Sequence, residues 1–249
     1  MGNHGDLDAR VSAAQNRKTP PAVLHELASD SSAQVRAAVA GNPKAPAEAL
    51  RPLTRDRDRK VRGAVAKNPA ASQGNLLRLL DDTDRWIRWA VATNPSCDAR
   101  IRHKMATAKD KELRGLAAEM KDLEPDLAAL LLEDVSPEVR ERLAGHTQDP
   151  EVITALLKDR TVRVRKGVAV NKHTTPEQRS ILAQDYAPEV RAALVRAVEL
   201  EESDLQALVK DRSVEVRRSL ATSDVTPPHI REALKNDPDE AVASDARRY

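Results

Sequence analysis

The 249-residue chain contains no phenylalanine, and aromatic residues make up only 2% of it. A thick globular core usually depends on large aromatic side chains. We therefore expect thin layers of Val, Leu, Ile and Ala in place of one such core. Charged residues amount to 32% of the sequence, which suits an elongated molecule with much surface.

Further absences bear on chemistry. The single cysteine, Cys97, excludes an intramolecular disulfide and a cysteine-based metal cluster. The eight glycines form no phosphate-binding loop, and the six histidines lack the spacing of metal ligands. The sequence therefore predicts no catalytic residue, no bound metal and no cofactor. His103 follows Cys97 by six residues, but this pair is weak evidence for a nucleophile, so a non-enzyme is favoured and an enzyme is left open.

The chain also lacks the segments that direct a protein to a membrane. No apolar run approaches the length of a membrane span. The N-terminal residues MGNHGD show no signal-peptide pattern. We therefore expect a cytoplasmic protein with no membrane partner.

What the sequence does contain is an arginine that returns every 26 residues, with one step of 25. A fixed period of this size is typical of a solenoid, in which each repeat buries its apolar face against its neighbours. We expect a single solenoid domain over residues 1–249, with ten repeats of which the last is truncated. The arginines are Arg10, Arg36, Arg62, Arg88, Arg114, Arg140, Arg165, Arg191 and Arg217.

Two helices are predicted in each repeat. Apolar residues stand one before, three after and four after the arginine, as Val61, Val65 and Ala66 do in the third repeat. These offsets share one face of a helix. A second apolar column, which includes Leu79, indicates a shorter helix of two or three turns, α-helical or partly 3₁₀, and Asn-Pro turns separate the two. The expected fold class is all-α, an α-solenoid of about ten 25–26-residue helix–turn–short-helix repeats without a sheet.

An aspartate stands six residues before most of these arginines, as Asp30 and Asp56 do. The unit Asp-x4-Val-Arg-x2-Val-Ala-x-Asn-Pro resembles the HEAT-repeat motif and, more closely, the short leucine-rich-repeat-variant motif. It reads DSSAQVRAAVAGNP at 30–43 and DRDRKVRGAVAKNP at 56–69. The resemblance covers about residues 4–243. Some variant-repeat proteins carry an N-terminal iron–sulfur cysteine cluster, but this chain has no such cysteines, so that activity is not implied here.

The arginine column could bind a polyanion or stabilise the fold. The resemblance implies a ladder of Asp–Arg pairs between neighbouring repeats. The fork of an arginine matches a carboxylate well, and an aspartate near a helix start can also cap that helix. We therefore predict a structural role for the arginines, and likewise for the asparagines of the turns.

The formal net charge of +2 hides an uneven distribution of charge. Residues 51–114 carry sixteen basic and eight acidic side chains, a net charge of +8. Residues 115–160 carry five basic and eleven acidic side chains, a net charge of −6. Such polarity along a chain can steer an anionic partner to one zone.

Two tryptophans lie in the basic segment. Trp86 occupies a column that is otherwise polar, two residues before the arginine, and Trp89 follows on the same helix. Because tryptophan dominates binding hot spots, this pair indicates a contact site, although it could instead pack on an adjacent loop. Three residues before the arginine, basic side chains recur in consecutive repeats at Arg59, Arg85 and Lys111, and Lys60 and Lys67 extend this basic column. The predicted site consists of Trp86, Trp89, Arg59, Lys60, Arg85 and Lys111.

The predicted function is a non-enzymatic scaffold whose extended curved surface binds a protein or peptide partner. The alternative is a nucleic-acid-binding protein, since basic residues beside stacking aromatics suit nucleic acid and segment 51–114 would supply the contact. Alkylpurine DNA glycosylases of HEAT-like fold are similar in architecture only, because their catalytic aspartate matches no single position here. The partner's identity, the superhelix handedness and the oligomeric state are left open.

Overall fold

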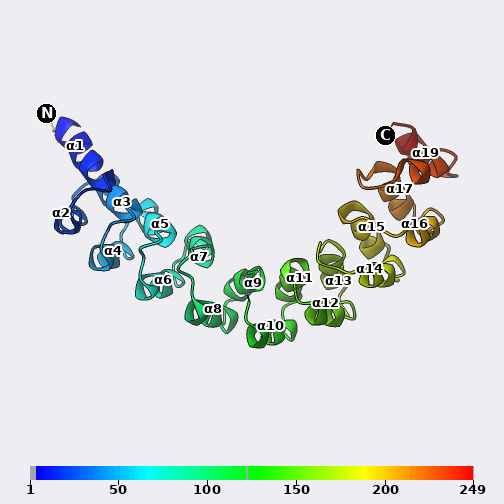
Figure 1. Ribbon diagram of the computed structural model, residues 1–249, viewed down its shortest axis with the longest axis horizontal. Helices are drawn as coiled ribbons and strands as arrows, with labels where there is room; N and C mark the ends of the chain where they lie inside the picture. Colours follow the sequence, from blue (N-terminus) through cyan, green and yellow to red (C-terminus); the bar gives the residue numbers. More distant parts are fainter. Residues whose placement is uncertain (1–3, 122, 249) are drawn as a thin grey trace. The chain divides into compact units, whose positions relative to one another are not determined.

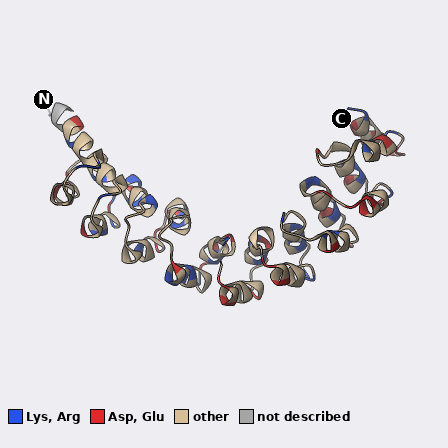
Figure 2. Ribbon diagram, in the orientation of Figure 1, with Lys and Arg blue, Asp and Glu red and all other residues tan. Residues whose placement is uncertain are grey.

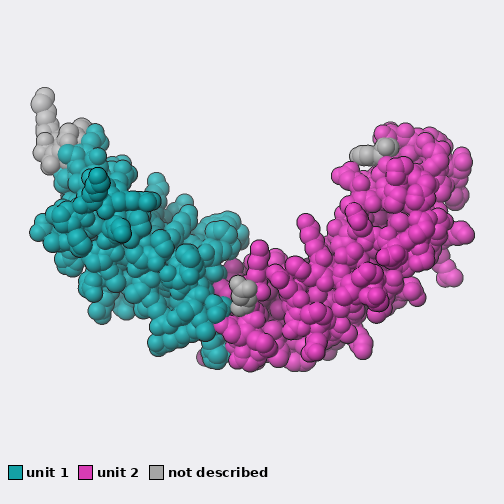
Figure 3. Space-filling view, viewed as in Figure 1, with its two compact units in different colours: residues 1–108 teal, residues 109–249 magenta. Residues whose placement is uncertain are grey.

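The computed structural model describes residues 4–121 and 123–248, and these residues form helices and no strand (Figure 1). The chain divides into two compact units, Met1–Ala108 and Lys109–Tyr249 (Figure 3). The predicted all-α solenoid class is confirmed. The single domain expected over residues 1–249 stays a prediction.

Each of the first nine repeats consists of a first helix, which carries the arginine position, and a second helix of seven or eight residues that is α-helical and not 3₁₀. In the first unit the helices are α1 His4–Gln15, α2 Pro21–Leu27, α3 Ala33–Gly41, α4 Ala47–Leu53, α5 Arg59–Lys67, α6 Gln73–Leu79, α7 Arg85–Ala92 and α8 Ala99–Ala106. In the second unit they are α9 Lys111–Ala118, α10 Pro125–Leu132, α11 Pro137–His146, α12 Pro150–Leu156, α13 Val162–Ala169, α14 Pro176–Ala183, α15 Pro188–Ala197, α16 Glu202–Leu208, α17 Val214–Thr222, α18 Pro228–Leu234 and α19 Glu240–Arg248.

Within each unit the helices form two layers. First helices pack on the first helices of adjacent repeats, as α3 does on α5 and α11 on α13, and second helices pack on second helices, as α4 does on α6. The apolar columns predicted from the sequence lie between the layers: Val61 and Val65 are fully buried, and Leu79 is nearly so. The core is therefore a series of thin aliphatic layers, as the lack of aromatics predicts.

Most first helices begin after a short polar side chain, although α15 begins after Ala187. Asp58 accepts a hydrogen bond of 2.8 Å from the backbone N–H of Lys60, and Asp84 accepts one of 2.8 Å from Trp86. Each aspartate satisfies an N–H group that the helix itself leaves without a partner. These caps fix where α5 and α7 start, and so fix which residues the two helices present to solvent.

The arginine column forms the predicted ladder. Nε of the arginine lies 2.5 to 2.8 Å from Oδ2 of an aspartate at the start of the next repeat. Oδ1 of the same aspartate accepts a backbone N–H two residues onward, at 2.7 to 2.9 Å. The structural role predicted for the column is confirmed for the eight arginines that form these pairs. The pairs in the described residues are Arg10–Asp30, Arg36–Asp56, Arg62–Asp82, Arg114–Asp134, Arg140–Asp159, Arg165–Asp185, Arg191–Asp211 and Arg217–Asp237.

Pairing makes several ladder carboxyls more acidic. The hydrogen bond from Arg36 is the main cause that lowers the pKa of Asp56. Burial by itself would raise the pKa of Asp211, but the hydrogen bonds from Arg191 and from the Ser213 N–H outweigh it, so that this pKa is lowered as well. The same balance lowers the pKa at Asp82, Asp159 and Asp237.

A second ladder is formed by the asparagines of the turns. The side-chain amide of Asn68 donates to the backbone oxygen of Ala40 at 2.7 Å and to that of Asn42 at 2.9 Å, both in the preceding repeat. Asn171 makes the equivalent pair of bonds in the second unit. Each such side chain satisfies carbonyl groups at the end of the previous first helix, so the asparagine column is structural, as predicted.

Candidate partner-binding groove

A groove of about 470 Å³ lies between α5 and α7 in the first unit. Its floor is formed by small and aliphatic side chains, namely Gly63, Ala64, Ile87 and Ala90. Its rim is formed by Arg59, Lys60, Lys67, Asp84 and Trp86. Three of the predicted site residues, Arg59, Lys60 and Trp86, therefore line one hollow.

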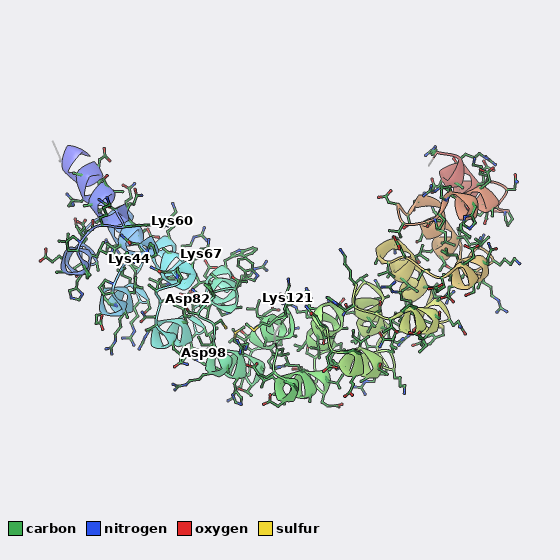
Figure 4. All side chains as sticks on the ribbon, viewed as in Figure 1. Lys44, Lys60, Lys67, Asp82, Asp98 and Lys121 are labelled. Atoms are coloured by element: carbon green, nitrogen blue, oxygen red, sulfur yellow. The ribbon has the colours of Figure 1, made fainter. Side chains whose placement is uncertain are left out.

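The sequence places these residues on equivalent stripes of two neighbouring helices. On α5, Lys60, Gly63 and Lys67 follow the spacing of three and four residues that keeps side chains on one face. On α7, Trp86 and Trp89 follow the same spacing. Figure 4 shows Lys60 and Lys67 together on α5. Because α5 packs on α7, the charged stripe of α5 and Trp86 line the same groove, whereas Trp89 is not one of its lining residues.

Both tryptophans are solvent-exposed, and for Trp86 the polar character of its column predicts this. Trp86 is 61% exposed and Trp89 is 44% exposed. The two rings meet edge to face, with centroids 6.5 Å apart, and the guanidinium of Arg85 lies 4.8 Å from the centre of the Trp86 ring. The cation and the edge contact hold Trp86 against α7. A preoriented indole loses less conformational entropy when a partner covers it.

The rim of the groove is predominantly positive. Arg59 lies 3.6 Å from Asp84, which compensates part of its charge. In the described part of the chain, no carboxylate lies within ion-pair distance of Lys60 or Lys67, and both residues are exposed. The groove therefore offers two ammonium groups on the same face of α5.

Lys111, the sixth predicted site residue, belongs to the second unit. It is the first residue of α9, and its Nζ lies 3.9 Å from Glu138 Oε1. The groove of the first unit is therefore built without it, and the contribution of Lys111 to a site stays a prediction.

The equivalent face between α9 and α11 in the second unit is filled by its own chain. A Cβ atom placed on Gly115 would stand 2.9 Å from Cδ of Arg142, so the arginine side chain lies directly over that glycine. The Arg142 guanidinium lies 3.2 Å from Glu112 and 3.0 Å from Glu119. By contrast, a Cβ atom on Gly63 in the first unit would meet nothing closer than Ile87, at 3.9 Å.

The two faces share one sequence register. Glu112 stands two residues before the arginine of its repeat, and Glu119 stands five residues after it, just past the end of α9. At the same two positions the repeat of α5 has lysine. Alanine on α7 replaces the arginine that α11 inserts. The corresponding pairs are Lys60 and Glu112, Gly63 and Gly115, Lys67 and Glu119, and Ala90 and Arg142.

Two other hollows follow the arginine ladder. One contains Arg62 and Asp82, and the other contains Arg140 and Asp159. In both hollows these charged groups already bind each other at 2.7 Å. Their hydrogen-bonding capacity serves the fold, so the α5–α7 groove is the stronger candidate for a site.

Within residues 4–121 and 123–248, no three His, Cys, Asp or Glu side chains are placed to hold a metal ion. Across the same residues, no helix has both the length and the apolar character needed to cross a membrane.

Comparison with known proteins shows what the repeats resemble. The model of the leucine rich repeat variant family matches residues 33–58. A solved structure described as a leucine-rich repeat variant with a novel repetitive structural motif has 24% identity and a TM-score of 0.52, covering 94% of this chain and 84% of that one. The chain thus carries a repeat that matches the leucine-rich-repeat-variant model at residues 33–58, and it shares the helical-repeat fold that its motif predicts. At this identity the structural likeness establishes the fold alone.

Two designed armadillo repeat proteins are more distant matches. One is described as made for modular peptide recognition, and the other as in complex with the peptide (KR)4. Each has 17% identity and a TM-score of 0.21, with 97% of both chains covered. A TM-score of this size supports no inference about this chain. A comparison with curated proteins found no match.

Sequence reasoning missed the floor of the groove. Gly63, Ala64 and Ala90 were not among the predicted site residues, because small residues in a helical repeat ordinarily indicate close packing. A signal was nevertheless present, because Gly63 and Gly115 occupy one column of the repeat. The repeat that follows Gly63 has Ala90 at the position where the repeat that follows Gly115 has Arg142.

Proposed function

We propose that this helical-repeat protein is a non-enzymatic scaffold that binds a protein or peptide partner at the α5–α7 groove. The observation that carries the proposal is the exposed Trp86, held by Arg85 and Trp89 at the rim of a groove with an apolar floor. Aromatic anchors beside hollows are the usual centres of binding energy at protein interfaces. A groove of this size accepts a few side chains of an extended segment.

Nucleic acid is the second candidate, favoured by the net charge of +8 over residues 51–114. Two features weigh against it. Basic side chains occur on both layers of the first unit, on α5 and on α8 (Figure 2), so they do not form one track for a phosphate backbone. Arg62 binds Asp82 in the ladder. A protein or peptide partner therefore accounts better for the groove.

The test is selection of a random dodecapeptide display library on the full chain, followed by binding isotherms with the enriched peptides. Trp86→Ala should weaken binding at least tenfold, which corresponds to about 1.4 kcal/mol. Its melting temperature should stay nearly unchanged, because the side chain is 61% exposed. Val135→Ala is the matched control, since Val135 is 87% exposed in the second unit and its truncation should change neither quantity.

Two outcomes would contradict the proposal. One is a Trp86→Ala variant with a lowered melting temperature and unchanged peptide affinity, which would make Trp86 structural. The other is a failure to enrich any peptide that depends on Trp86, together with binding of a 20-base-pair DNA duplex that weakens steeply between two salt concentrations. That second outcome would favour the nucleic-acid alternative.

A further inference from the structure

We propose that the partner is an acidic peptide segment, and that one of its Glu or Asp side chains inserts over Gly63 between Lys60 and Lys67. This inference rests on the proposed function and adds the chemical class of the partner. Its basis is that the second unit carries the same arrangement with the charges reversed and the inserted side chain supplied by the chain itself.

The α9–α11 face shows what such an insertion looks like. Arg142 crosses Gly115 and binds Glu112 in α9 and Glu119, the residue that follows the C-terminal end of α9, seven residues further along the chain. One inserted charge therefore reaches two partners on the same helical face, about two turns apart. The glycine is needed because a larger residue would occupy the path of the inserted side chain.

The α5–α7 face repeats this arrangement with opposite sign. Lys60 and Lys67 are likewise seven residues apart, with Gly63 between them. Ala90 stands where α11 carries Arg142, so the first unit supplies no side chain to fill the hollow. The group that complements two ammonium ions over a glycine is a carboxylate, as a guanidinium complements two carboxylates in the second unit.

The remaining rim indicates what lies beside that carboxylate. Trp86 provides an exposed apolar wall at the same groove, which favours an apolar side chain next to the acidic one. Asp84 stands on the rim and pairs with Arg59 at 3.6 Å. A continuous phosphate backbone would bring charges toward this carboxylate, whereas a single inserted Glu or Asp need not approach it. An acidic peptide thus fits better than nucleic acid.

The first test uses the peptides selected from the random dodecapeptide library. Glu and Asp should be enriched beside an apolar residue, and replacing the conserved acid by its amide should weaken binding about tenfold. Lys60→Gln/Lys67→Gln should cause a similar loss with the acidic peptide. When the amide peptide is combined with Lys60→Gln/Lys67→Gln, the two losses of binding free energy should not add, since each change removes the same interaction.

Charge exchange provides the sharper test. Lys60→Glu/Lys67→Glu should reject the acidic peptide and should bind the same peptide with lysine in place of its acid. Both lysines are exposed, so the variant should fold normally. A double variant that binds neither peptide, while its melting temperature is unchanged, would overturn the inserted-carboxylate arrangement.

A third variant copies the second unit into the first. Lys60→Glu/Lys67→Glu/Ala90→Arg should fill the groove with the chain's own arginine and abolish binding of both peptides. It should keep the melting temperature of the wild type, or exceed it. If it binds the lysine peptide as well as the double variant does, Gly63 is not the place of insertion.

The outcomes separate this inference from the proposed function. Peptides that depend on Trp86 but show no acidic enrichment and no sensitivity to Lys60→Gln/Lys67→Gln would leave the scaffold proposal standing and overturn the acidic partner. A selection without any Trp86-dependent peptide would overturn both. Wild-type self-association that Lys60→Glu/Lys67→Glu abolishes, seen by analytical ultracentrifugation, would instead identify a second copy of the chain as the occupant.

Discussion

The α5–α7 face and the α9–α11 face are built on the same register and differ in what covers one glycine. Gly63 lies under an open groove bordered by lysines, while Gly115 lies under Arg142, which glutamates hold in place. In the closed face, the charges of Arg142 and the two glutamates compensate one another, so few charged groups remain for a partner to bind. A repeat protein can thus create a site by omitting one inserted side chain and reversing the charges that would have bound it.

The arginine ladder stabilises both units, and lowering the pH should have the largest effect on it. The ladder carboxyls with lowered pKa in the folded chain contribute stability above the unfolded pKa of about 4. This stability is lost as the pH falls through their folded pKa values. We expect the free energy of unfolding to be nearly constant from pH 7 to 5 and to fall steeply below about pH 4.

Urea unfolding followed by circular dichroism at several pH values measures this change. Arg140→Met/Asp159→Asn, which lacks one of the pairs, should show a shallower decline. A free energy of unfolding that rises as the pH falls to 3 would contradict the lowered pKa values.

The next largest effect should come from breaking one ladder pair beneath the closed face. Arg140→Ala removes the arginine partner of Asp159, whose side chain is only 10% exposed, and leaves that carboxylate with its hydrogen bonds from Thr161. We expect a loss of about 2–4 kcal/mol in the free energy of unfolding. Arg140→Met/Asp159→Asn should recover part of that loss because no uncompensated charge remains. Peptide affinity at the α5–α7 groove should not change in either variant, and a loss of binding by folded Arg140→Ala would assign the column to function.

A pair of glycine substitutions separates an open face from a closely packed one. A Cβ atom on Gly167 in α13 would lie 2.7 Å from the backbone oxygen of Glu141, whereas one on Gly63 would make an ordinary contact. Gly167→Ala should therefore destabilise the protein by about 1–3 kcal/mol. Gly63→Ala should stabilise it by about 0.5–1 kcal/mol through helix propensity. Equal effects of the two substitutions in urea unfolding would show that the faces are packed alike.

The smallest effect concerns Arg142, the side chain that covers Gly115 in the closed face. The side chains of Arg142 and Glu119 are about one-third exposed and that of Glu112 is about half exposed, so their pairing contributes little. Arg142→Ala should cost about 0.5–1 kcal/mol of stability, and less at high salt. In a background of Glu112→Gln/Glu119→Gln the same substitution should cost almost nothing. A cost that is independent of salt and of that background would indicate that Arg142 acts through packing.

The candidate site could be predicted from the sequence only in part. Trp86 stood out because it breaks a polar column, and its exposure agrees with that reasoning. Arg59 and Lys60 stood out because basic residues recur in register, and both line the groove. Ala90 gave no such signal, because the sequence does not distinguish an alanine that packs against a neighbouring helix from one that lines a groove.

The sequence by itself determined the repeat, its two helices and the buried aliphatic columns, and it indicated structural roles for the arginine and asparagine columns. These depend on contacts within a repeat and with the next one, so a column of identical residues records each contact directly. The tertiary structure alone decided which face is open. Whether a glycine is covered depends on the reach and path of a side chain from the facing helix, as Arg142 shows over Gly115, and that geometry is set only when the two helices pack together.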